Sequence, residues 1–112
     1  MDAFTLAELL DRRSRAGSPY LEFLRRPDLS LGLYVLDAGA VDRQQPHTED
    51  EAYVVLAGRG RFTAGSETRD VGPGDTIFVP ARVPHRFHDI VETLRLIVAF
   101  GPAEGSRAGD AG

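Results

Sequence analysis

The spacing of apolar residues changes from a helical to an alternating pattern near residue 19. Leucines between residues 6 and 10 recur at helical spacing, and Thr5 is followed three residues later by Glu8, as in a capping box. The Gly-Ser-Pro run at residues 17–19 ends the helical pattern. We therefore predict a short N-terminal helix and arm over residues 1–18.

Residues 19–101 consist of short apolar or alternating runs separated by turn residues. Residues 57–60 (AGRG) and 65–66 (GS) each predict a turn between strands. Strands spaced roughly 8–12 residues apart are typical of an all-β sandwich or barrel. The strand candidates are residues 20–24, 29–36, 52–56, 61–64, 67–71, 76–79, 85–89 and 94–100.

The length of 112 residues favours a single domain. Twelve glycines and seven prolines fit a chain with many turns, which short strands need and a helical bundle does not. We expect a β-barrel over residues 19–101. Residues 102–112 are rich in glycine, alanine and charge, and are predicted to form a disordered tail.

Charge and cysteine content narrow the range of partners. The net charge of −4 argues against a nucleic-acid partner, which would favour a basic surface. Without cysteine there is neither a disulfide nor a thiolate metal site, so any metal must be held by nitrogen and oxygen. No apolar run approaches the roughly 20 residues of a membrane-spanning helix, and the N-terminus does not resemble a signal peptide. We expect a cytoplasmic protein with no membrane partner.

Candidate metal ligands gather just before the strand at 52–56. On an extended chain, Gln45, His47 and Glu51 would point to the same side. His85 on a neighbouring strand is the natural further candidate. Imidazole and carboxylate ligands suit one divalent transition metal per chain, such as Zn, Fe, Mn or Ni. Taken singly, either histidine could instead be a hydrogen-bonded structural residue.

Two spaced motifs in this region resemble those of the cupin superfamily. The first family motif has the form G(x)5HxH(x)3-4E(x)6G, and the second has the form G(x)5PxG(x)2H(x)3N. The matching positions of this chain are Gly39, Gln45, His47, Glu51 and Gly58 in the first motif, and Gly74, Pro80, Arg82, His85 and Asp89 in the second. The chain departs from the family at Gln45 (usually histidine), Arg82 (usually glycine) and Asp89 (usually asparagine).

The resemblance implies a double-stranded β-helix, or jelly-roll, cupin barrel of the small single-domain type, preceded here by the short helix. It also implies metal binding by His47, Glu51 and His85. Gln45 is either a further ligand, weaker than imidazole for late transition metals, or a nearby polar group. The family resemblance further implies a dimer, and the exposed sheet edge expected at residues 20–24 agrees with a homodimer.

Aromatic residues are expected around the cavity. Tyr53 and Phe87 share the parity of the ligands, and Phe62 and Phe78 are further candidates for lining the pocket. Packing alone explains these residues, but Tyr53 is also a candidate catalytic proton donor. Glu49 and Asp50 are expected to be a solvated acidic pair at the mouth of the barrel, or at most to contact the metal ligands from outside.

We therefore expect a metal-dependent enzyme, of dioxygenase, isomerase or lyase type, acting on a small molecule inside the barrel. The alternative from another class is a non-catalytic module that binds or senses a small molecule. A purely structural barrel that has lost its metal is a third alternative. The fold alone does not choose among these activities.

Overall fold

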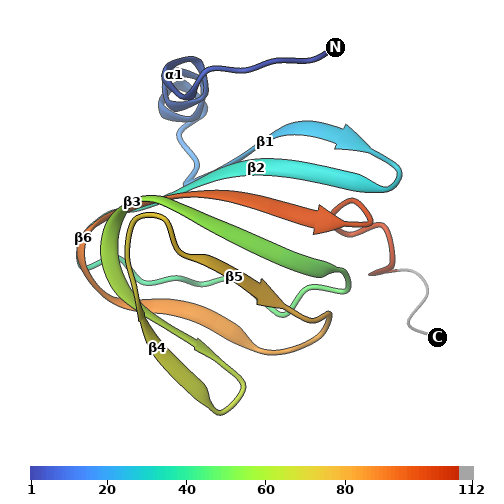
Figure 1. Ribbon diagram of the computed structural model, residues 1–112. Helices are drawn as coiled ribbons and strands as arrows, with labels where there is room; N and C mark the ends of the chain where they lie inside the picture. The colour runs from blue at the N-terminus through green and yellow to red at the C-terminus, as the bar shows by residue number, and fades with distance from the viewer. Residues whose placement is uncertain (109–112) are drawn as a thin grey trace.

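The computed structural model describes residues 1–108 of the chain (Figure 1). Within these residues, one helix is followed by strands that form a curved antiparallel sheet. The elements are α1 (Leu6–Ala16), β1 (Tyr20–Arg26), β2 (Leu29–Leu36), β3 (Asp50–Ala64), β4 (Glu67–Val71), β5 (Thr76–Val79) and β6 (His85–Gly101).

The predicted N-terminal helix is present and capped at both ends. The Thr5 hydroxyl accepts a hydrogen bond of 3.2 Å from the Glu8 N–H. Gly17 ends α1 in the left-handed conformation, with φ of 74°. Leu9 is buried against Leu33 and Val35 of β2, so the helix covers one outer side of the sheet (Figure 1). Within the described residues, no helix is long and apolar enough to cross a bilayer.

The sheet is built around the pairing of two long strands. Its strand order is β1-β2-β6-β3-β4, and β5, which lies off this path, pairs with β3 over residues 51–54. Strand β3 pairs with β6 from Asp50 opposite Gly101 to Ala64 opposite His85. Register shifts between Val55 and Arg61 bend the pair. The bend lets one face of both strands enclose a core.

One predicted turn is wrong, because residues 57–60 form no hairpin. Strand β3 runs through this segment without a break and keeps its pairing with β6. The glycines there accompany β-bulges instead of a chain reversal. The turn at 65–66 is confirmed, since it joins β3 to β4. Residues 85–89 and 94–100 are likewise one continuous strand, β6.

The core is aromatic at its centre. The Tyr53 ring lies edge-on to Phe62 and Phe87, with centroids 5.6 and 5.0 Å away, and the Phe62 and Phe87 rings are 4.6 Å apart. Aliphatic residues of β2, β3, β5 and β6 surround this group. The aromatic group fills the middle of the barrel and forms a floor beneath the polar residues described below.

The segment after β6 is folded, contrary to the disordered tail expected from residue 102. Residues 102–108 form turns, and Ala103 is only 2% exposed. The backbone N–H groups of Gly105 and Arg107 donate to the two carboxylate oxygens of Glu49, at 2.7 and 3.0 Å. These contacts explain why a segment of low hydrophobicity folds here. Residues 109–112 lie outside the described part of the chain.

Candidate metal centre

Three of the four predicted ligands converge in the structure. One ligand atom each from His47, Glu51 and His85 lies within 4.8 Å of the other two. Glu51 stands at the start of β3, His85 at the start of β6, and His47 in the irregular segment before β3. On β3, Glu51, Tyr53 and Val55 are all buried, because alternate residues of the strand face the barrel interior.

The loop that carries His47 is held by the second motif. The Arg82 N–H donates to the His47 carbonyl at 2.6 Å. Arg82 has φ of 69°, a left-handed conformation that glycine adopts more easily. Its backbone therefore explains why the related motif has glycine at this position. The His47 ring also packs edge-on against Phe100, with centroids 4.7 Å apart.

The protonation of His85 is set by a backbone contact. Nδ1 of His85 lies 2.8 Å from the Val83 carbonyl oxygen, which can only accept a hydrogen bond, so Nδ1 carries the proton. In the neutral ring, Nε2 then has a free lone pair. Burial lowers the pKa of His85, but the Glu51 carboxylate and the Val83 carbonyl outweigh burial and raise it overall.

One carboxylate oxygen of Glu51 lies close to His85 Nε2 and has no hydrogen-bond partner in the described residues. Oε1 of Glu51 lies 2.9 Å from His85 Nε2 and 3.8 Å from His47 Nε2. The side chain is only 2% exposed, and Oε1 has no hydrogen-bond partner of acceptable geometry within residues 1–108. A buried carboxylate oxygen facing imidazole nitrogens calls for a positive charge, either a proton or a metal ion.

Gln44 supplies a further oxygen, which the sequence did not predict. Its Oε1 lies 3.2 Å from His47 Nε2 and accepts a 2.9 Å hydrogen bond from the Tyr53 hydroxyl. Its amide nitrogen donates to the buried Asp42 at 2.6 Å. Asp42 also accepts a 2.6 Å hydrogen bond from Tyr34. Because Asp42 fixes the amide, the Gln44 oxygen faces the centre.

The expectation that Gln45 points into the site is wrong. Gln45 is exposed, whereas the adjacent Gln44 is half-buried at the centre. The two-residue alternation holds only on an extended strand, and β3 begins at Asp50. Residues 41–49 are irregular, so parity could not be counted back from Glu51.

The predicted pocket aromatics take different places. Tyr53 is completely buried, and its hydroxyl lies 3.1 Å from His85 Nε2. Burial, together with the charge of Glu51, raises the pKa of Tyr53, so the phenol keeps its proton. Phe62 and Phe87 form the floor beneath the centre. Phe78 is wrong as a lining residue: it is 63% exposed, because its neighbour Val79 faces inward. The catalytic role of Tyr53 stays a prediction.

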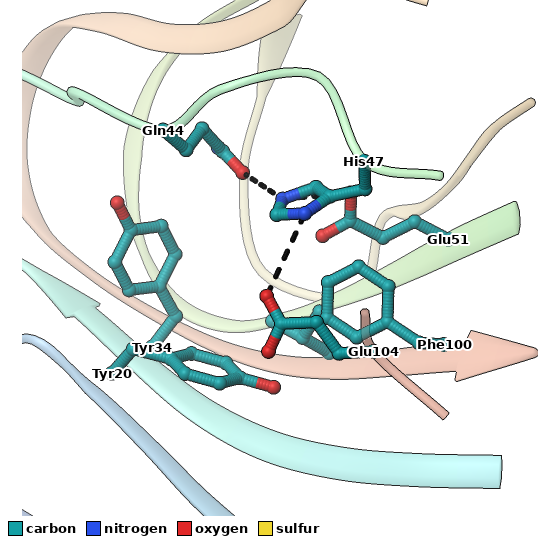
Figure 2. Close-up of a pocket in the computed structure, with 8 residues that line it drawn as sticks. Tyr20, Tyr34, Gln44, His47, Glu51, Phe100 and Glu104 are labelled. Atoms are coloured by element: carbon teal, nitrogen blue, oxygen red, sulfur yellow. Dashed lines mark hydrogen bonds and ion pairs between the residues drawn. The ribbon is translucent and has the colours of Figure 1, made fainter. Parts of the chain in front are cut away.

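A cavity of about 140 Å³ is lined by two of the three ligand residues, His47 and Glu51, but not by His85 (Figure 2). Its walls are aromatic and acidic, and Glu104 of the C-terminal segment forms part of them. The lining residues are Tyr20, Tyr34, Gln44, His47, Glu51, Val98, Phe100 and Glu104. Tyr20 and Glu104 could not be assigned to the cavity from the sequence, since neither lies near the motifs.

The cavity contains two carboxylates, Glu51 and Glu104, and none of the lining residues is arginine or lysine. The pKa of Glu104 is raised, chiefly by burial; the nearby His47 acts against this rise, and neighbouring carboxylates add to it. A divalent cation would therefore find a favourable charge environment here.

Gly32 determines where the Tyr20 ring lies. An added Cβ at Gly32 would stand 2.1 Å from Cζ of Tyr20, so the ring rests on the glycine. We expect Gly32→Ala to displace the ring and to cost about 1–3 kcal/mol of unfolding free energy, as overpacking does. In a Tyr20→Ala background the same change should cost far less. Urea denaturation of the four proteins measures this; an equal cost in both backgrounds would contradict the contact.

The fold and the site together define a small antiparallel β-barrel with a histidine–glutamate group inside. The family model described as "Cupin domain" matches residues 32–100. An uncharacterized protein of Streptomyces coelicolor is 49% identical over 104 residues, which are 93% of this chain and 99% of the relative. The chain therefore belongs to the cupin family, and the predicted jelly-roll cupin barrel is confirmed.

Solved structures agree with this assignment. The TT1209 protein of Thermus thermophilus has a TM-score of 0.75 at 23% identity, covering 92% of this chain and 99% of that one, and supports the fold. KdgF from a Halomonas species has a TM-score of 0.67 at 25% identity, covering 74% of this chain and 76% of that one. The DMSP lyase DddQ of Ruegeria pomeroyi has a TM-score of 0.63 at 27% identity, covering 68% of this chain but 39% of that one.

Proposed function

We propose that this protein is a metal-dependent enzyme that acts on a small molecule in the cavity beside His47, Glu51 and His85. The observation that carries the proposal is the buried Oε1 of Glu51. It lies 2.9 Å from His85 Nε2 and has no hydrogen-bond partner of acceptable geometry within residues 1–108. A divalent cation bound by all three residues would satisfy both atoms.

The donor set fits a transition metal such as Zn, Fe, Mn or Ni. Two imidazoles and one carboxylate are suitable ligands for these ions. Gln44, and not Gln45, is our candidate for a fourth ligand, since its oxygen already lies 3.2 Å from His47 Nε2. An amide oxygen is a harder ligand than imidazole, which favours Mn or Fe within this group. The bound metal would supply a Lewis acid to polarise an oxygen of the substrate.

The chain's own residues would bind and orient the substrate. The rings of Tyr20, Tyr34 and Phe100 offer apolar walls, and the Glu104 carboxylate accepts hydrogen bonds. Tyr53 holds its proton between Gln44 and His85, and so keeps both groups oriented. A lyase among the similar structures agrees with an enzymatic role for a barrel of this kind.

We also propose that the protein works as a cytoplasmic homodimer. The outer face of β3 and β5 exposes apolar side chains, namely Val54, Leu56 and Phe78. A second copy covering this face would remove them from water. The absence of cysteine agrees with a reducing compartment. Light scattering at micromolar concentration tests the dimer, which a monomer would contradict.

The first experiment is elemental analysis of the untagged protein, followed by incubation of the loaded protein with small-metabolite mixtures read by mass spectrometry. We expect close to one divalent metal per chain and turnover that is lost on chelation. Saturable binding without turnover would instead favour a non-catalytic binding module. Absence of metal after incubation with Fe, Mn, Ni and Zn would overturn the metal centre.

A further inference from the structure

The two histidines of the centre differ in what holds their second nitrogen. His85 Nδ1 donates to a backbone carbonyl at 2.8 Å, which leaves Nε2 free for a metal. His47 has no such carbonyl contact among the described residues. Its Nδ1 faces the Glu104 carboxylate at 3.6 Å, and its Nε2 faces Gln44 Oε1 at 3.2 Å (Figure 2).

These two contacts of His47 favour opposite tautomers. Gln44 Oε1 would accept a hydrogen bond from an Nε2–H, and a proton on Nε2 blocks metal binding there. Glu104 would accept a hydrogen bond from an Nδ1–H, and the tautomer with its proton on Nδ1 leaves the lone pair of Nε2 toward Glu51 and His85. A carboxylate behind a metal-bound histidine fixes the ring and raises its basicity as a ligand.

Glu104 is held in place by its backbone. Its N–H donates to Ser30 Oγ at 2.9 Å, and its carbonyl accepts from Arg25 Nη2 at 2.9 Å. The next turn is bound by Glu49, which is only 1% exposed and receives the N–H groups of Gly105 and Arg107. The pKa of Glu49 is lowered overall, because hydrogen bonds from Thr48 and these N–H groups outweigh the effect of its burial. The backbone contacts thus place Glu104 beside His47, and within residues 1–108 its carboxylate makes no hydrogen bond of its own.

We propose that Glu104 is a positioning residue for the metal centre, and that the segment 102–108 is part of the site. In the loaded protein its carboxylate accepts the Nδ1–H of His47 and holds the Nε2 lone pair toward the metal. This inference rests on the proposed metal centre. Glu104 lies outside residues 32–100, which the family model matches, so this carboxylate is a contribution of the chain's own C-terminal segment.

The test compares zinc binding by the full chain with that of Glu104→Ala and Glu104→Gln, using competition with a chromophoric chelator. We expect zinc affinity to fall about 10–100-fold in Glu104→Ala. The fall should be smaller in Glu104→Gln, whose amide oxygen still accepts a hydrogen bond. Both variants should fold, since the segment is anchored through its backbone. Circular dichroism checks the fold.

The matched control is Glu92→Ala, which removes an exposed carboxylate of β6 that holds neither Glu104 nor His47 within residues 1–108. If zinc affinity fell as much in this control as in Glu104→Ala, the loss would come from the net charge of the protein and not from the contact with His47. That result would overturn the proposal. Nitrogen-15 NMR of the loaded protein gives a second readout: Nδ1–H in the parent, and a mixed or altered state in Glu104→Ala. A parent that binds zinc, with affinity and tautomer unchanged in Glu104→Ala, would refute the role of Glu104 alone. A parent that binds no zinc would refute the metal centre as well.

Discussion

Glu51→Gln is expected to abolish tight metal binding without destabilising the metal-free protein. The change removes the only charged ligand of the three, so affinity should fall by more than the roughly 10–100-fold typical of an outer partner. The metal-free protein loses an unsatisfied buried carboxylate oxygen. Its replacement, an amide NH₂, can donate to the lone pair of His85 Nε2 at the same place. The unfolding free energy should therefore stay equal or rise.

This pair of results separates a metal site from a structural ion pair. If His85 and Glu51 were an ordinary buried salt bridge, removing the charge of one partner would cost roughly 3–5 kcal/mol. Urea denaturation of the chelated protein measures stability, and elemental analysis measures bound metal. His88→Ala is the matched control, because His88 bonds to Thr63 and Asp89 away from the centre. A large loss of stability in Glu51→Gln would argue for the salt bridge.

The fold could be predicted where the signals are local. The capping residues of α1 and the turn at 65–66 depend on neighbours in sequence, and both were placed correctly. Glycines 58 and 60 gave the same signal as a turn but lie in bulges of β3. A glycine needed for a close approach to a distant strand is not distinguishable from a turn glycine without knowledge of that strand.

The residues of the site also divide into those that could be predicted from the sequence and those that depend on the folded chain. His47, Glu51 and His85 were identified from motif spacing, although Glu51 and His85 lie at opposite ends of the β3–β6 pair and His47 lies outside the strands. Gln44 and Glu104 were missed for different reasons: Gln44 lies in an irregular segment, and Glu104 reaches the centre through contacts across more than 50 residues of sequence.

Glu49 was expected to be solvated, yet it is buried as the anchor of the C-terminal segment. Its burial depends on hydrogen bonds from backbone N–H groups of residues 105 and 107, and no local sequence pattern indicates these donors. A charged residue can be placed inside only when its partners are known.

Gly58→Ala is expected to be the most damaging single change to the fold. Gly58 has φ of 93°, and an added Cβ would meet backbone atoms of β6: Thr93 O at 2.1 Å and Leu94 Cα at 2.7 Å. Backbone cannot move aside as a flexible side chain can, so β3 and β6 would have to separate at the bulge. We expect a loss above about 4 kcal/mol, which is a large part of the roughly 5–15 kcal/mol that stabilises a domain.

Gly74→Ala measures how much of that loss in unfolding free energy comes from the left-handed backbone conformation alone. Gly74 has a similar φ of 90°, but apart from its two chain neighbours no atom of residues 1–108 lies within 4 Å of the added Cβ. It should therefore show only the cost of a left-handed alanine, about 1–2 kcal/mol. Urea denaturation of both variants gives the difference, which measures the contact between the two long strands. Because Glu51 on β3 and His85 on β6 depend on that contact for their approach, Gly58→Ala should also lose metal, whereas Gly74→Ala should keep it. Similar stability losses in the two variants would show that the strands do not approach so closely at Gly58.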